Sequence, residues 1–185
     1  GSPDDIKFFD PKFTGKGMDA SGIGFYFTSD SSDADRYIGG SNDRSKDGYG
    51  GNVMPVYLRI QKPINFDRQP NITATAIKKI LSGVPKAELT EFLGDNYDIE
   101  SEGFYRCYND YVSALVGTEL VRASFSLYND VFSRSSVSHK FPALFMKATG
   151  RDGIIRENSE TVHYIVFTAN QIKSAVGNNG DFTLS

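Results

Sequence analysis

Two kinds of hydrophobic pattern divide the chain into strand-rich ends and a helix-rich middle. From about residue 70 to 148 the apolar residues recur at spacings of three and four, which predicts amphipathic helices. Outside this stretch, runs of aromatic and β-branched residues bounded by turn residues predict strands, at 23–28, 53–60, 153–155 and 162–167. Pro55 indicates an edge position for the second strand because it cannot donate to a ladder.

The connection after the first strand has a pattern of its own. Cap-type residues from Asp30 onward, with Ala34 and Tyr37 at helical spacing, predict a short helix. Residues 39–52 are rich in glycine and polar residues, so we expect a flexible loop there.

The order of these elements predicts the fold class. Strands, then helices, then strands indicate an α+β fold rather than alternating βαβ units. We predict one domain over 1–185, with 70–148 as a helical insertion between the middle and C-terminal strands. Gly1-Ser2 is typical of a cloning remnant, so we expect the chain to be part of a longer protein.

Composition narrows the classes of function. No run of 18 apolar residues and no signal-peptide pattern is present, so we expect a soluble, cytoplasmic protein with no membrane partner. The net charge of −3 argues against sequence-independent nucleic-acid binding. One cysteine, Cys107, excludes an internal disulfide, and with only two histidines we expect no metal site.

Charge is concentrated in one segment. Residues 122–156 carry six basic and two acidic side chains. This segment is either a solvated face or a surface for an acidic protein, an RNA or the pyrophosphate of a ligand.

Three local patterns resemble the ADP-ribosyltransferase fold. The first is Gly24-Phe25-Tyr26-Phe27 with Ala34 and Tyr37 after it, the second tyrosine eleven residues beyond the first. The others are the strand 56–60 running into Lys62-Pro63-Ile64, and a C-terminal series at 152–155, 163–167 and 170–174. The resemblance is to the His-Tyr-Glu branch, which includes diphtheria-toxin-like enzymes and poly(ADP-ribose) polymerases, and above all to transferase domains of phage and mobile-element polyvalent proteins. It implies a split β-sandwich.

The resemblance also implies a substrate, NAD, and residues that bind it. Tyr26 and Tyr37 would sandwich the nicotinamide ring, since stacking adds about 0.5–1.5 kcal/mol per aromatic pair beyond area burial. Gly24 would admit the amide of nicotinamide to backbone hydrogen bonds. The remaining aligned positions expected near NAD are Phe27, Ala34 and Gln171. The alternative is structural: both tyrosines are core aromatics, and Gln171 pairs with backbone groups.

The family's catalytic glutamate has no direct counterpart in this sequence. Aligning 164–167 with the family pattern places His163 at the glutamate position. Glu160 has the opposite strand parity, so a one-residue β-bulge would be needed to bring it into the site. No histidine precedes Tyr26, although the family carries one on an upstream strand.

These features together predict an NAD-dependent mono-ADP-ribosyltransferase of a phage, mobile element or bacterial effector, acting in the cytoplasm of its own or a target cell. We expect a protein acceptor rather than a nucleic acid. Tyr26, with His163 or Glu160, would form the catalytic site. Two alternatives stay open: a degenerate transferase fold that acts as a binding module, and an NAD glycohydrolase in which water replaces the acceptor.

Overall fold

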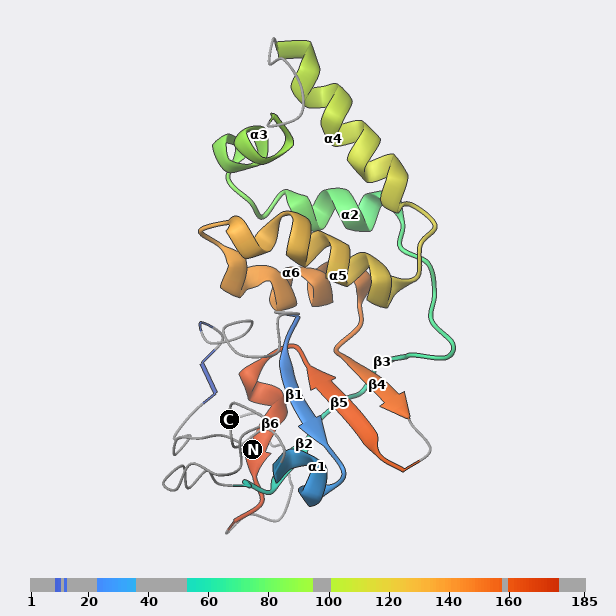
Figure 1. Ribbon diagram of the computed structural model, residues 1–185, viewed down its shortest axis with the longest axis vertical. Coiled ribbons are helices and arrows are strands. Elements are labelled where there is room, and N and C mark those ends of the chain that lie inside the picture. Colours follow the sequence, from blue (N-terminus) through green and yellow to red (C-terminus); the bar gives the residue numbers. More distant parts are fainter. Residues whose placement is uncertain are drawn as a thin grey trace, which may run out of the picture.

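The computed structural model describes residues 9–10, 12, 23–35, 53–94, 101–157 and 160–176. Helices α2 to α6 lie above the strands in Figure 1, so the described part of the chain has a helical layer and a β layer. Tyr37 and the loop expected over 39–52 lie outside the described residues.

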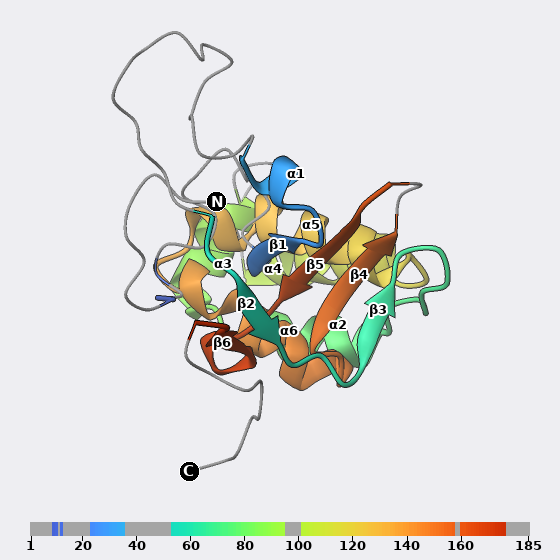
Figure 2. The same ribbon diagram turned by 90° about the horizontal axis from the view of Figure 1, so that it is seen from below.

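Two small sheets make up the β layer. The larger has the order β1-β5-β4-β3, with β3 parallel to β4 and the other pairs antiparallel. Its strands are β1 (Phe25–Thr28), β3 (Pro63–Asn65), β4 (Gly153–Glu157) and β5 (Val162–Val166). The smaller sheet pairs β2 (Val56–Leu58) antiparallel with β6 (Ile172–Ser174). Figure 2 shows the four strands of the larger sheet side by side, with the helices behind them.

The helices predicted over 70–148 are confirmed, because the described residues between 74 and 149 form five α-helices. They are α2 (Ala74–Leu81), α3 (Lys86–Gly94), α4 (Ser101–Leu115), α5 (Leu120–Asp130) and α6 (Phe141–Thr149). A sixth, α1 (Ser31–Asp35), follows β1, and short 3-10 turns lie at Phe132–Arg134, Ser138–Lys140 and Ala169–Gln171.

Local chemistry sets several of the helix ends. The Thr73 hydroxyl accepts a hydrogen bond from the N–H of Ala76, which caps the start of α2. Pro142 stands in the first turn of α6, where a missing N–H costs nothing, and Gly150 ends that helix with a left-handed φ of 69°.

One face of the larger sheet packs against the helices. Ile64, Ile154 and Ile165 are register neighbours across β3, β4 and β5, so their side chains share a face. They belong to the same apolar core as residues of α2, α5 and α6. Many of the aromatic residues are part of this core. Phe132, Phe141, Phe145 and Phe167 form a chain of ring contacts between 4.8 and 5.7 Å.

The α+β class is confirmed, and the two sheets are compatible with an ADP-ribosyltransferase fold. The sequence did not predict β3 and β6, each of three residues. The run predicted as one strand over 53–60 ends as β2 at Leu58, because the Asp152 carboxylate accepts the N–H groups of Gln61 and Lys62 at 2.8 and 2.7 Å. That contact redirects the chain into β3.

Candidate functional site

The structure places Tyr26 and His163 on the same face of the larger sheet. Tyr26 is opposite Ile165 and Thr28 is opposite His163, so the two residues form a diagonal pair across β1 and β5. Cα atoms of such pairs are about 7–8 Å apart, within reach of aromatic side chains. Tyr26 is partly buried and packs against the apolar core. The sheet register therefore brings together two of the residues that the sequence selected.

His163 lies between two side chains from different elements. Its Nε2 atom is 3.1 Å from Oδ2 of Asp33, on α1, and 3.3 Å from Oγ1 of Thr161. The imidazole is about one-third exposed, at 32%, whereas the Asp33 side chain is only 14% exposed. Asp30 helps to hold α1 in place, because its carboxylate accepts the Ser32 N–H at 2.8 Å and its carbonyl accepts the Ala34 N–H.

On the other side of His163, Arg156 of β4 is its register partner and lies on the same face. The guanidinium of Arg156 stands 4.9 Å from the ring centroid of Phe66, a cation–π contact. Phe66 in turn lines a pocket of about 340 Å³. Arg156 is therefore a neighbour both of His163 and of a residue that lines this pocket.

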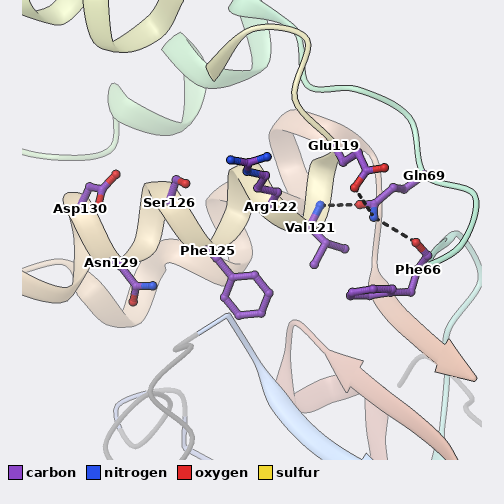
Figure 3. A pocket seen from close by; sticks show the side chains of 9 residues that line it. All are labelled: Phe66, Gln69, Glu119, Val121, Arg122, Phe125, Ser126, Asn129 and Asp130. Carbon is purple, nitrogen blue, oxygen red and sulfur yellow. Dashed lines mark hydrogen bonds between the residues drawn. The ribbon is translucent and has the colours of Figure 1, made fainter. Parts of the chain in front are cut away.

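The pocket lies between α5 and the segment that links β3 to α2. Its lining residues are Phe66, Gln69, Glu119, Val121, Arg122, Phe125, Ser126, Asn129 and Asp130. In Figure 3, Phe125 points from α5 toward the strands, and Arg122 and Asp130 lie along the side of α5 that faces away from them. Such a volume is at the lower end of the range for small-molecule sites.

Hydrogen bonds hold the walls of the pocket. Gln69 accepts the Val121 N–H at 2.7 Å and donates to the carbonyl of Phe66 and the carboxylate of Glu119. At the opposite end the Tyr111 hydroxyl donates to Asp130 at 3.3 Å. Burial of Tyr111, reinforced by the nearby Asp130 charge, raises the pKa of its hydroxyl, which therefore stays a neutral donor.

A family model described as the ADP-ribosyltransferase in polyvalent proteins matches residues 1–182. The chain belongs to this family. No significant match was found among curated proteins or solved structures. The site on the Tyr26 face is therefore a site on an ADP-ribosyltransferase domain.

Gly24 of the transferase domain has a packing role. A Cβ atom there would lie 2.4 Å from the carbonyl oxygen of Val166 and 2.9 Å from the side chain of Ile165. Its lack of a side chain lets the start of β1 approach β5. Phe27 lies on the opposite face of β1 from Tyr26, where its ring contacts Phe9 at 5.8 Å.

Glu160 is not drawn into the sheet. Pairing of β5 with β4 is continuous over Val162–Val166, with no bulge, and Glu160 lies before this strand with an exposed side chain. Ala34 lies half-buried on α1, one residue after Asp33. Tyr37, the expected second half of the nicotinamide clamp, is outside the described residues.

Gln171, which the resemblance places near NAD, bonds to backbone groups in this structure. Its Oε1 atom accepts the N–H groups of Phe167 and Thr168 at 3.0 and 2.9 Å. Its Nε2 atom donates to the carbonyls of Arg59 and Asp152 at 3.0 and 2.6 Å. The amide has no bonding capacity left for a nucleotide, and the buried Gln171 instead ties three chain segments together.

Sequence reasoning did not predict that Asp33 contacts His163, or that Arg156 contacts an aromatic residue of the pocket. Asp33 stands in a polar run that reads as a helix start, and its distance to His163 is a property of the fold alone. The basic surplus of 122–156 was the available signal for Arg122 and Arg156, though not for where their side chains lie.

Two further features are absent from the described residues. None of their helices is both long and apolar enough to cross a membrane. No group of three or more His, Cys, Asp or Glu side chains in that part of the chain could hold a metal ion.

Proposed function

We propose that this domain is an NAD-dependent mono-ADP-ribosyltransferase that transfers ADP-ribose from NAD to a protein acceptor and releases nicotinamide. The observation that carries the proposal is the shared sheet face of Tyr26 and His163 in a chain of this family. The bond to be broken joins nicotinamide to ribose. Tyr26 would stack on the nicotinamide, and His163 on the same face would lie toward the ribose.

The reaction needs a site that stabilises positive charge on a sugar. As nicotinamide leaves, the ribose carbon passes through an oxocarbenium-like transition state, as in glycoside hydrolysis. The Tyr26 ring, which packs against the apolar core, would stack on nicotinamide. His163, about one-third exposed on the same face, offers a ring nitrogen to the ribose side of that bond.

Positive charge beside this face suits the diphosphate of NAD. Arg156 is on the same face as His163, and Arg122 lines the neighbouring pocket. A guanidinium pairs with phosphate oxygens through two parallel hydrogen bonds, which fixes orientation as well as charge. We assign the basic surplus of 122–156 in part to this role.

The proposal is tested by nicotinamide release from NAD in the presence and absence of a mixture of candidate protein acceptors, with ¹⁴C-labelled adenosine to follow transfer. Wild-type protein should release nicotinamide and label protein. Tyr26→Ala should lower the rate at least about tenfold, because a stacked pair and the buried ring area are both lost. Tyr26→Phe keeps the ring and should retain most activity. Equal rates for wild type and Tyr26→Ala would place the site elsewhere.

The product separates the two alternative functions. Free ADP-ribose without labelled protein would indicate an NAD glycohydrolase. The exposed position of Glu160, outside the sheet, favours a binding module as the other alternative. In that case NAD would neither raise the melting temperature nor be consumed.

A further inference from the structure

The contact between Asp33 and His163 joins two elements that meet only in the folded chain. The Asp33 Oδ2 atom lies 3.1 Å from Nε2 of His163, within the distance of an ion pair. Asp33 comes from α1, just after β1, whereas His163 comes from β5, the strand that pairs with β1. The antiparallel pairing of Thr28 with His163 is what brings α1 alongside the imidazole.

An imidazole alone does not meet the charge requirement of the proposed reaction. The transition state carries positive charge on the ribose, and an uncharged His163 ring supplies no negative charge to oppose it. A carboxylate in direct contact with the ring does supply one. Asp33, at 14% exposure, is shielded enough from water for its charge to act over a short distance.

We propose that Asp33 and His163 act together as a catalytic dyad, with Asp33 orienting the imidazole and supplying the negative charge of the site. This inference rests on the proposed transferase function. In this dyad the Nε2 atom, which faces Asp33, carries the proton, so the Nδ1 atom carries the lone pair and becomes the base. Asp33 is the positioning residue, and His163 is the catalytic residue.

The step balances without a further reagent. The bond between the ribose anomeric carbon and the nicotinamide nitrogen breaks, and nicotinamide leaves as a neutral molecule with the bonding electron pair. A hydroxyl, amine or thiol of the acceptor forms the new bond to that carbon. Its proton passes to Nδ1 of His163, and the carboxylate of Asp33 stabilises the imidazolium that results.

A purely structural ion pair between α1 and β5 is the competing explanation, and it predicts different data. Such a pair affects stability and leaves the chemical step per folded molecule unchanged. The dyad predicts a loss in the chemical step and makes it depend on which residue stands at 163. A glutamate at that position carries its own negative charge, so it should remove the need for Asp33.

The experiment measures single-turnover nicotinamide release for wild type, Asp33→Asn, His163→Glu and the double variant. Asp33→Asn keeps the shape of the side chain and should lower the rate about 100-fold, because the imidazole loses the carboxylate that orients it and stabilises its positive charge. Asp35→Asn, an exposed aspartate on the same helix, should match wild type. In the His163→Glu background, Asp33→Asn should change the rate by less than about threefold. Melting temperatures confirm that each variant is folded.

The tautomer of His163 gives a readout that needs no variant of Asp33. Long-range ¹H–¹⁵N spectra of wild type, with His139→Gln to assign the only other histidine, should show a proton on Nε2 and none on Nδ1. A proton on Nδ1 overturns the dyad.

The kinetic outcomes distinguish the dyad from the transferase itself. An active wild type with equal rates for Asp33→Asn and Asp35→Asn overturns the dyad and leaves the transferase in place. If the wild type is inactive and His163→Glu restores nicotinamide release, the dyad is likewise overturned and the transferase function stands. If neither wild type nor His163→Glu releases nicotinamide, the proposed function fails, and the dyad fails with it.

Discussion

The carbonyl oxygen of Val166 lies where a side chain on Gly24 would begin, 2.4 Å from the position of its Cβ atom. Gly24 is buried at the start of β1, and Val166 is the last residue of β5. The obstacle is backbone, which cannot rotate away as a side chain can. The close approach of these two strands therefore depends on glycine at position 24.

Gly24→Ala should lower the free energy of unfolding by about 2 kcal/mol or more, as overpacking against a fixed group does. Urea denaturation measures the loss. Gly117→Ala is the matched control, because Gly117 has a left-handed φ of 83° but nothing within 4 Å of a Cβ atom. It should cost only the backbone strain, about 1 kcal/mol. Equal costs for the two variants would contradict the close approach of β1 to β5.

Gln171→Ala should destabilise the domain without changing its affinity for NAD. The substitution removes a hydrogen bond from the buried N–H of Phe167 and from the partly buried carbonyls of Arg59 and Asp152, and a fully buried unsatisfied group costs about 1–3 kcal/mol. Urea midpoints should fall well below that of Gln61→Ala, a control in which an exposed glutamine is removed. A raised KM for NAD in the folded Gln171→Ala protein would instead restore Gln171 as a nucleotide ligand.

Glu88 should make stability depend on acidic pH. Hydrogen bonds from the hydroxyls of Ser135 and Ser136, with the N–H of Ser136, hold the pKa of the Glu88 carboxyl below its ordinary value of 4.5. A lowered pKa in the folded state means that the contribution is fully present above about 4.5 and is lost as the pH falls through the lowered value.

Melting temperatures of wild type and Glu88→Gln should therefore differ at pH 7 and converge as the pH falls through the lowered pKa of Glu88. Glu91→Gln, an exposed glutamate on the same helix, should show no such pH-dependent difference. A constant gap between wild type and Glu88→Gln from pH 7 to pH 3 would show that the charge of Glu88 has no role in its contacts.

Arg156 and Arg134 provide a matched pair for the diphosphate proposal. Both are exposed arginines stacked on a phenylalanine ring, Arg156 at 4.9 Å from Phe66 and Arg134 at 5.5 Å from Phe92, but only Arg156 shares the face of His163. Arg156→Ala should raise the KM for NAD about tenfold, and Arg134→Ala should leave it unchanged. Arg156→Lys should fall between, since lysine keeps the charge and loses the bidentate geometry. Equal KM values for the two alanine variants would remove Arg156 from the site.

Much of the fold could be predicted from local patterns. The strand at Phe25–Thr28, the helix that follows it and the helical insertion all have clear signals, because alternation and three-four spacing act within a few residues. The strands β3 and β6 could not be predicted, since three residues are too few to show a period. Asp152, about 90 residues away in sequence, contributes the contact that separates β2 from β3.

For the candidate site, the sequence by itself determined which types of residue are available and which protein family the chain resembles. It placed Tyr26 on a strand after a glycine and put a histidine where the family carries glutamate. It also raised the choice between His163 and Glu160, which depends on the pairing of β5. It could not separate a nucleotide-binding Gln171 from one that bonds to backbone groups.

Only the tertiary structure decided which residues meet. The register of β1 with β5 sets Tyr26 and His163 on one face, and the same pairing brings Asp33 within 3.1 Å of the imidazole. The amide of Gln171 makes its hydrogen bonds to chain segments that are far apart in sequence. Local propensities act over a turn or a strand, whereas these contacts come from the packing of distant segments, which no window of sequence contains.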